Sequence, residues 1–158
     1  MMPRVFILMG SASDLPVAEK AISILKSFDV SFEIAVASAH RTPERVKSLV
    51  NEIDADVFIT IAGLSAALPG VVASFTTKPV IGVPVSGEVS LDSMLSVLQM
   101  PPGVPVAAVG LDRGDNAALL AIQIISLSDE GLSKRLLTHR KEMAEKILSD
   151  SERVSTNV

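Results

Sequence analysis

The sequence predicts a three-layer α/β fold, in which a doubly wound parallel sheet lies between helices and one extra helix follows at the C-terminus. Two observations predict it. Short apolar runs alternate along the chain with longer segments whose apolar residues recur at helical spacing. The run at residues 5–9 is apolar throughout, as in strands that are covered on both faces. Strands separated by helices need crossover connections, and these make the strands parallel.

Five segments have the composition of strands. Each is a short apolar run, and the first and third are followed by glycines, Gly10 and Gly63, at which a turn can begin. In chain order, the expected strands are residues 5–9, 32–37, 57–62, 80–83 and 104–109.

Six segments show helical periodicity. In the first, Val17, Ala21 and Leu25 share one face, and the third has Pro69 near its start, where a missing N–H matters least. The last segment is amphipathic, and we expect the polar residues 150–158 to form a flexible tail after it. In chain order, the expected helices are residues 14–28, 45–53, 66–75, 91–98, 116–127 and 129–149.

These elements follow one another without a linker, a repeat or a low-complexity segment. A chain of 158 residues is long enough for one sizeable core and short for two. We therefore expect a single domain over residues 1–158, with five strands in a flavodoxin-like arrangement.

The composition excludes several classes of function. With 14 basic and 18 acidic residues and no basic patch, the chain is not expected to bind nucleic acid or an anionic membrane surface. It has no cysteine, which excludes disulfides and thiolate chemistry and fits a cytoplasmic protein. Its mean hydropathy of +0.45 is high, yet no apolar run is long enough to span a membrane. We expect copies of the chain to bury the excess against one another in a homo-oligomer.

The loops that follow the strands hold the candidate site, because ligands of open parallel sheets bind at the carboxyl ends of the strands. In the first loop, Ser11 and Ser13 precede a helix whose exposed N–H groups suit a phosphate, and Asp14 could bind a sugar hydroxyl. The alternative is that these residues only cap the helix.

The second loop places His40 and Arg41 together, in a chain with two histidines. Histidine can transfer protons near neutral pH, and arginine can hold a phosphate through two parallel hydrogen bonds. The alternative is a chance pair in a solvated loop. The third loop, AGLSAALPG, consists almost entirely of small residues, which allow a ligand or a neighbouring subunit to approach, or helices to pack tightly.

Other kinds of site find little support. Two distant histidines without cysteine give no metal-ligand cluster, and neither a P-loop nor a GxGxxG motif is present. The chain also lacks the tryptophan and tyrosine that usually stack on a flavin ring.

Together these loops resemble the PurE family of N5-carboxyaminoimidazole ribonucleotide mutases. The resemblance runs through MGSASD, SAHRTP, the AGLSAALPG segment, PVIGVPV, LDSMLSVLQMPPGVPVA and DNAALLA, in the family's order over nearly the whole chain. It implies a flavodoxin-like octamer of de novo purine biosynthesis that uses neither a metal nor an organic cofactor. The reaction that it implies is an isomerisation, which moves a carboxylate from the exocyclic nitrogen of the substrate to ring carbon 4.

The resemblance also implies a role for each matching residue. His40 falls on the family's catalytic histidine, which donates and accepts one proton. The residues that fall on positions holding the phosphoribose or lining the pocket are Ser11, Ser13, Asp14, Ser38, Arg41 and Gly63.

The chain departs from the family pattern at two positions. Ala67 stands where bacterial mutases usually have a histidine before LPG, and Ser90 stands where glycine is usual. AIR carboxylases, which use CO2 directly, also lack that histidine, but they typically have lysine where this chain has Arg41. The sequence therefore favours a mutase and keeps an AIR carboxylase as the alternative. A non-catalytic nucleotide-phosphate binding module is a third hypothesis, which would leave His40 without a role.

Overall fold

The computed structural model describes residues 4–156 and contains the predicted parallel sheet. Its five strands lie in the order β2-β1-β3-β4-β5, which is the order of flavodoxin-like folds. The strands are β1 (Val5–Met9), β2 (Phe32–Val36), β3 (Val57–Ala62), β4 (Val80–Pro84) and β5 (Ala107–Ala108). All four neighbouring pairs are parallel, which confirms the predicted crossover connections.

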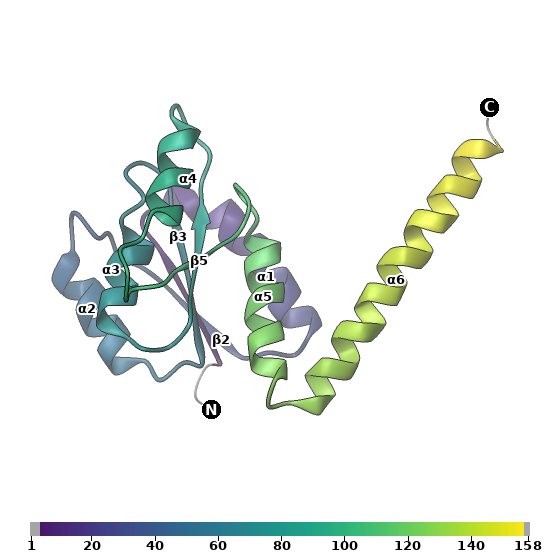
Figure 1. Ribbon diagram of the computed structural model, residues 1–158, viewed down its shortest axis with the longest axis horizontal. Coiled ribbons are helices and arrows are strands. Elements are labelled where there is room, and N and C mark those ends of the chain that lie inside the picture. Colours follow the sequence, from purple (N-terminus) through teal and green to yellow (C-terminus); the bar gives the residue numbers. More distant parts are fainter. Residues whose placement is uncertain (1–3, 157–158) are drawn as a thin grey trace.

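Helices cover both faces of the sheet and make the three layers (Figure 1). A short 3-10 helix, η1 (Ala12–Asp14), leads into the first α-helix. The α-helices are α1 (Leu15–Ser27), α2 (Pro43–Glu52), α3 (Leu68–Phe75), α4 (Ser90–Leu98), α5 (Gly114–Ser126) and α6 (Glu130–Ser155). None of the helices within residues 4–156 is long and apolar enough to cross a bilayer.

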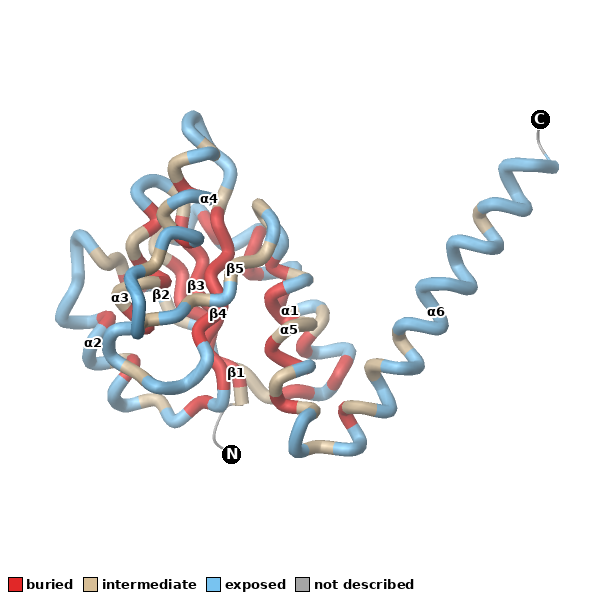
Figure 2. Tube along the Cα trace, in the orientation of Figure 1, coloured by how far each residue is buried: buried red, intermediate tan, exposed pale blue. Residues whose placement is uncertain are grey.

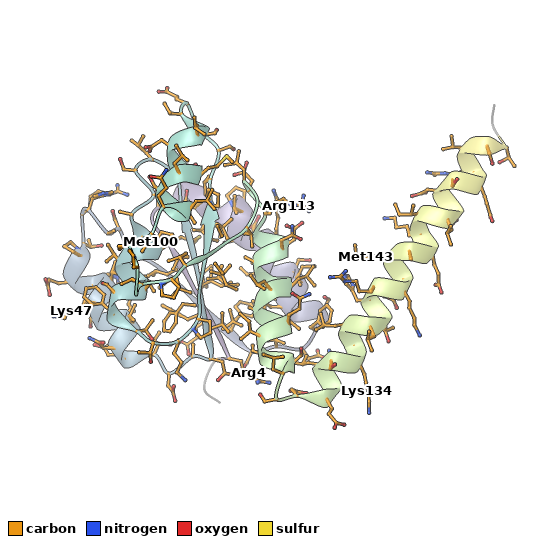
Figure 3. All side chains as sticks on the ribbon, in the orientation of Figure 1. Arg4, Lys47, Met100, Arg113, Lys134 and Met143 are labelled. Atoms are coloured by element: carbon orange, nitrogen blue, oxygen red, sulfur yellow. The ribbon has the colours of Figure 1, made fainter. Side chains whose placement is uncertain are left out.

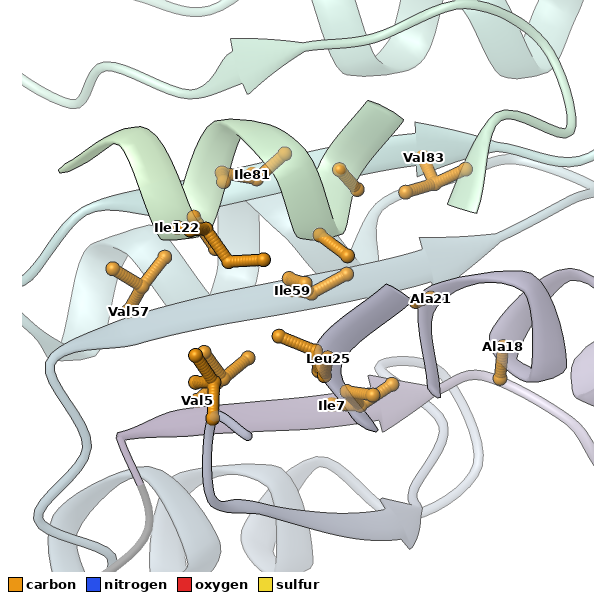
Figure 4. Close-up of a cluster of buried hydrophobic side chains, with 14 of the residues drawn as sticks. Val5, Ile7, Ala18, Ala21, Leu25, Val57, Ile59, Ile81, Val83 and Ile122 are labelled. Carbon is orange, nitrogen blue, oxygen red and sulfur yellow. The ribbon is translucent and has the colours of Figure 1, made fainter. Parts of the chain in front are cut away.

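The core lies in two clusters, because alternate residues of the central strands point to opposite faces. On the α1 and α5 face, Ile7 and Ile59 pack with Leu25 and Ile122 (Figure 4). On the α2, α3 and α4 face, Phe6 and Phe58 meet edge to face, with ring centroids 5.9 Å apart. Figure 2 shows the buried residues concentrated in the sheet and in the helices beside it.

A glycine brings α1 and α5 close together. A Cβ added at Gly114 would lie 2.1 Å from the carbonyl oxygen of Val17, far inside van der Waals contact. The close approach packs Ala117, Ala118 and Ala121 of α5, all fully buried, toward the sheet.

Two elements differ from the sequence prediction by more than two residues at one end or both. The fifth strand was expected over residues 104–109, but only Ala107–Ala108 pairs with β4. It is an edge strand, and Pro105 has no N–H to donate to a ladder. The last helix was expected to end near residue 149, yet it continues to Ser155, through residues expected to form a flexible tail. An ion pair of 3.0 Å between Arg153 and Asp150 supports that last turn, while residues 157–158 lie outside the described residues.

Candidate active site

A cavity of about 330 Å³ opens at the carboxyl ends of β1 and β2. These strands pair from Val5 with Phe32 to Met9 with Val36, so the loops that follow them lie side by side. The cavity is lined by Gly10, Ser11, Ala12, Val36, Ala37, Ser38, Arg41, Thr42 and Arg45. Its position agrees with the expectation that a ligand binds at this edge of the sheet.

The first loop is held by hydrogen bonds between its own residues. The Ser11 N–H donates to the Asp14 carboxylate at 3.0 Å, which ties the start of the loop to η1. In return, the Ser11 hydroxyl oxygen accepts from the Ser13 N–H at 3.4 Å and from the Ser13 hydroxyl at 3.0 Å. Ser11 therefore caps η1 and also lines the cavity, while its contact with a phosphate stays a prediction.

Asp14 is a buried carboxylate beneath this loop, with 6% of its surface exposed. Burial raises the pKa of Asp14 above its ordinary value, while the hydrogen bond from Ser11 and the charge of Arg41 act in the opposite direction. Asp14 thus lies next to the cavity and is coupled electrostatically to its arginine.

Arg41 joins the two loops. Its Nη2 donates to the carbonyl of Gly10 at 3.2 Å, and its Nε donates to the Ser38 hydroxyl at 3.3 Å. The Arg41 backbone N–H donates to the same hydroxyl at 3.2 Å. These contacts hold the guanidinium at the cavity, where an arginine can bind an anionic oxygen.

Two further residues complete the cavity, one at the N-cap of α2 and one in its first turn. The sequence analysis missed both. Thr42 accepts the Ser38 N–H at 2.9 Å, and Arg45 donates through Nε to the Val36 carbonyl at 3.4 Å. The signal that could have found Arg45 is its position in the first turn of the helix that follows the Arg41 loop. With two arginines and several hydroxyl and backbone N–H groups, the cavity is suited to a phosphorylated ligand.

His40 and Gly63 do not line this cavity. His40 lies exposed in the turn between Ser38 and Arg41, and within residues 4–156 we find no hydrogen bond or ion pair for its imidazole. Gly63 follows β3, on the other side of the first loop, which the Gly10 N–H ties to the Ile61 carbonyl at 2.9 Å. Their roles in the site remain predictions.

Two carboxylates fix the loops that follow β3 and β4, and the sequence analysis missed both. Ser65 adopts a φ of 48°, and its N–H donates to Asp92 of α4 at 2.9 Å. The Ser86 N–H donates to Asp112 at 2.8 Å. No local pattern indicates these pairs, because each joins residues more than 25 positions apart.

Among the described residues, no three histidine, aspartate or glutamate side chains are grouped as metal ligands would be. The polar side chains that line the cavity are those of serine, threonine and arginine.

Comparison with known proteins identifies the family of the chain. The model of the family "AIR carboxylase" matches residues 4–146. An N5-carboxyaminoimidazole ribonucleotide mutase of Methanocaldococcus jannaschii is 59% identical over 149 residues, which cover 94% of this chain and 95% of that protein. A phosphoribosylaminoimidazole carboxylase of Saccharomyces cerevisiae is 42% identical, over 98% of this chain but 28% of that longer protein. The crystal structure of Treponema denticola PurE2-S38D superposes with a TM-score of 0.87 at 38% identity, covering 97% and 98% of the two chains.

Proposed function

The chain belongs to the AIR carboxylase family, and from this membership we propose that it is an N5-carboxyaminoimidazole ribonucleotide mutase of purine biosynthesis. Such an enzyme is an isomerase, which moves the carboxylate of its substrate from the exocyclic nitrogen to carbon 4 of the imidazole. The observation that carries the assignment is the cavity of serines and arginines at the carboxyl edge of the sheet, in a chain 59% identical to a mutase.

The phosphoribose of the substrate is assigned to the first two loops. Ser11, Ser38 and Arg41 line one cavity, and Ser13 is hydrogen-bonded to Ser11. Asp14 lies beneath them, and we assign to its carboxylate a hydrogen bond from a ribose hydroxyl. With the sugar phosphate held there, the imidazole would extend past the first loop toward Gly63, whose lack of a side chain leaves room for it.

His40 is assigned the proton transfers. As CO2 leaves the exocyclic nitrogen, the imidazolium gives that nitrogen a proton; carbon 4 then attacks the CO2, and the imidazole takes up the proton that carbon 4 releases. No proton is gained or lost overall. His40 is one residue from Arg41, so the group that binds the phosphate and the group that moves the proton share one turn.

We further propose that the protein is a cytoplasmic homo-oligomer, an octamer if it follows the family. The support is physical. Several large apolar side chains are exposed on α4 and the residues before it, among them Val89, Leu91 and Leu98, each about 60% exposed. Contiguous exposed apolar surface of this kind marks interaction sites in proteins that do not aggregate.

The assignment of His40 is tested by His40→Asn. Asparagine is close to histidine in size but cannot exchange the proton, so turnover should fall by about 100- to 10,000-fold. Affinity for the phosphoribose part, measured with AIR by calorimetry, should stay within about threefold because Arg41 and the serines are unchanged.

The chain offers a matched control in its second histidine. His139 lies on α6 against the Phe28 ring, with centroids 5.4 Å apart and away from the cavity. His139→Asn should keep turnover within about threefold of wild type. Turnover of His40→Asn within tenfold of wild type would remove His40 from its assigned role.

A further inference from the structure

The peptide group between Val85 and Ser86, directly after β4, is held at both of its ends. Its N–H, which belongs to Ser86, donates to the Asp112 carboxylate at 2.8 Å. Its carbonyl, which belongs to Val85, accepts from the Ser93 hydroxyl at 3.0 Å. Asp112 lies in the turn before α5 and Ser93 lies in α4, so two separate elements fix one peptide group. With donor and acceptor both engaged, this peptide cannot rotate without breaking a hydrogen bond.

Asp112 is itself held in an unusual backbone conformation. Its φ is 57°, in the left-handed region that few residues other than glycine adopt and that aspartate tolerates better than most. Its N–H donates to the Pro84 carbonyl at 2.9 Å, and its carbonyl accepts from the Lys20 ammonium at 3.0 Å. Figure 3 labels the next residue, Arg113, at the end of α5 that lies away from α6. Contacts from β4 and α1 therefore fix the direction in which the Asp112 carboxylate points.

Val85 lies against Gly63, the residue toward which the imidazole extends in the proposed binding mode. A Cβ added at Gly63 would lie 3.7 Å from the Val85 Cβ and 3.9 Å from the Val85 carbonyl oxygen. The Val85 N–H also donates to the Ala62 carbonyl at 3.0 Å, which ties the loop after β4 to the end of β3. The orientation of the Val85–Ser86 peptide therefore sets how closely this loop approaches Gly63.

We propose that Asp112 is a positioning residue of the mutase reaction. Its carboxylate holds the Val85–Ser86 peptide, so that Val85 stays against Gly63 and closes one side of the space occupied by the imidazole and the released CO2. Asp112 acts through this peptide and does not itself contact the substrate. The inference rests on the proposed function and adds to it a residue outside the loops that bind the sugar phosphate.

The consequence of a loose wall follows from the order of the reaction steps. Once CO2 has left the exocyclic nitrogen, either carbon 4 attacks it or the CO2 escapes from the site. Escape leaves AIR and CO2 in solution, and His40, which gave its proton to the nitrogen, regains one from water. A closed site favours the attack over the escape. The fraction of substrate that ends as AIR therefore reports how firmly the wall is held, and it does not depend on how much of the protein is folded.

The proposal is tested by Asp112→Gly. Glycine adopts a φ of 57° without strain, so this variant removes the carboxylate and keeps the backbone conformation. The rate of carboxylate transfer, kcat, should fall by about tenfold because the reacting groups are held less closely. The fraction that ends as AIR, corrected for breakdown without enzyme, should rise at least about threefold. KM should stay within about threefold, since the first two loops that bind the sugar phosphate are unchanged.

Two variants separate the carboxylate from the substitution itself. Asp112→Asn keeps an acceptor oxygen for the Ser86 N–H and should return kcat and the AIR fraction to within about threefold of wild type. Asp29→Gly is the matched control, because Asp29 has a φ of 49° and lies before β2, at the opposite edge of the sheet. It makes the same substitution in a similar backbone conformation and should leave kcat and the AIR fraction within about twofold of wild type.

The other end of the peptide gives a second test. Ser93 is buried, and its hydroxyl also donates to the Ser90 carbonyl of its own helix at 2.9 Å. Ser93→Ala releases the Val85 carbonyl and should raise the AIR fraction at least about twofold with KM within about threefold of wild type. An unchanged AIR fraction in folded Ser93→Ala would contradict the proposal, also in the case that Asp112→Gly does not fold.

Three further results would overturn the proposal. These are wild-type values of kcat and AIR fraction in Asp112→Gly, an Asp112→Asn as impaired as Asp112→Gly, or an Asp29→Gly as impaired as Asp112→Gly. The wild type separates this proposal from the mutase assignment. A wild type that does not convert the N-carboxylated substrate removes both, whereas an active wild type with an equally active Asp112→Gly removes only the role of Asp112.

Discussion

The carboxyl edge of the sheet has two halves that differ in how they are built. The polar half, residues 10–14 and 38–45, is held by hydrogen bonds among its own side chains, with Arg41 joining its two loops. The apolar half, residues 63–67 and 85–98, is fixed where Asp92 and Asp112 accept backbone N–H groups of its loops. This half also has exposed leucines: 86% of the surface of Leu64 and 62% of that of Leu91 is exposed.

We expect this difference to separate effects on affinity from effects on turnover. The polar half is held together by contacts within one chain, and we expect it to bind the sugar phosphate. The small residues of the apolar half allow a ligand to approach, and its exposed leucines can become buried only against a partner surface. Substitutions in the polar half, other than those of His40, should therefore act mainly on substrate affinity, and those in the apolar half mainly on the turnover of bound substrate.

The largest effect on substrate affinity is expected for Arg41→Ala. It would remove the proposed charge-assisted contact to the phosphate and the bridge between two loops, so KM should rise by about 10- to 150-fold while kcat changes little. Ser13→Ala should act in the same direction but more weakly. Steady-state kinetics provide the measurement, and Arg41→Lys is the control, since it keeps the charge but loses the fork of parallel donors. Normal KM values in both alanine variants would place the phosphate elsewhere.

Asp14→Asn is expected to lower affinity by about tenfold through the lost charge on the ribose contact. The same change should leave a pH signature in stability. Because burial raises the pKa of Asp14, the folded protein binds this proton more tightly than the unfolded chain does. Above the raised pKa, ionised Asp14 therefore lowers the free energy of unfolding. This loss of stability disappears as the pH falls through the raised pKa to below the ordinary pKa.

Asparagine at position 14 carries no such cost. The free energy of unfolding of Asp14→Asn relative to wild type should thus increase as the pH rises through that interval, as urea titrations at a series of pH values can measure. A relative stability that falls with rising pH would show that the ionised carboxylate stabilises the fold instead.

In the apolar half, Asp92→Ala should give the smallest effect and the opposite kinetic pattern. Ser65 would lose the acceptor for its N–H at a left-handed φ, so the third loop would sample other conformations. We expect kcat to fall by up to about tenfold with KM nearly unchanged. Asp92→Asn keeps an acceptor oxygen and should recover most of the rate. A rise in KM as large as that of Arg41→Ala would remove the distinction between the two halves.

How well the sequence predicts each feature depends on whether the cause is local. The central strands could be predicted because a strand that is buried on both faces consists of consecutive apolar residues, as at Val5–Met9. The fifth strand was predicted too long, because its apolar composition reflects packing near the edge of the sheet rather than pairing. The last helix was predicted too short, because its exposed end is rich in polar residues and resembles a tail in the sequence.

The same distinction applies to the site. Ser11, Ser38 and Arg41 could be predicted together because parallel strands bring the loops after them to one edge. The roles of Asp92 and Asp112 could not be predicted, because their hydrogen-bond partners depend on how α4 and the turn before α5 pack against the sheet. His40 was predicted from its loop, its chemistry and the family resemblance; it is exposed, and its role stays a prediction.

The central claim is that this chain transfers a carboxylate within its substrate and does not fix CO2 directly. The position in question is Ala67, the N-cap of α3, where the usual mutase histidine is absent. The most direct measurement compares turnover of N5-carboxyaminoimidazole ribonucleotide with turnover of AIR plus bicarbonate, for the wild type and for Ala67→His. We predict that both proteins prefer the N-carboxylated substrate and that their rates differ by no more than about tenfold, because His40 rather than residue 67 moves the proton. A wild type that converts AIR with bicarbonate efficiently and leaves the N-carboxylated compound unchanged would contradict the mutase assignment.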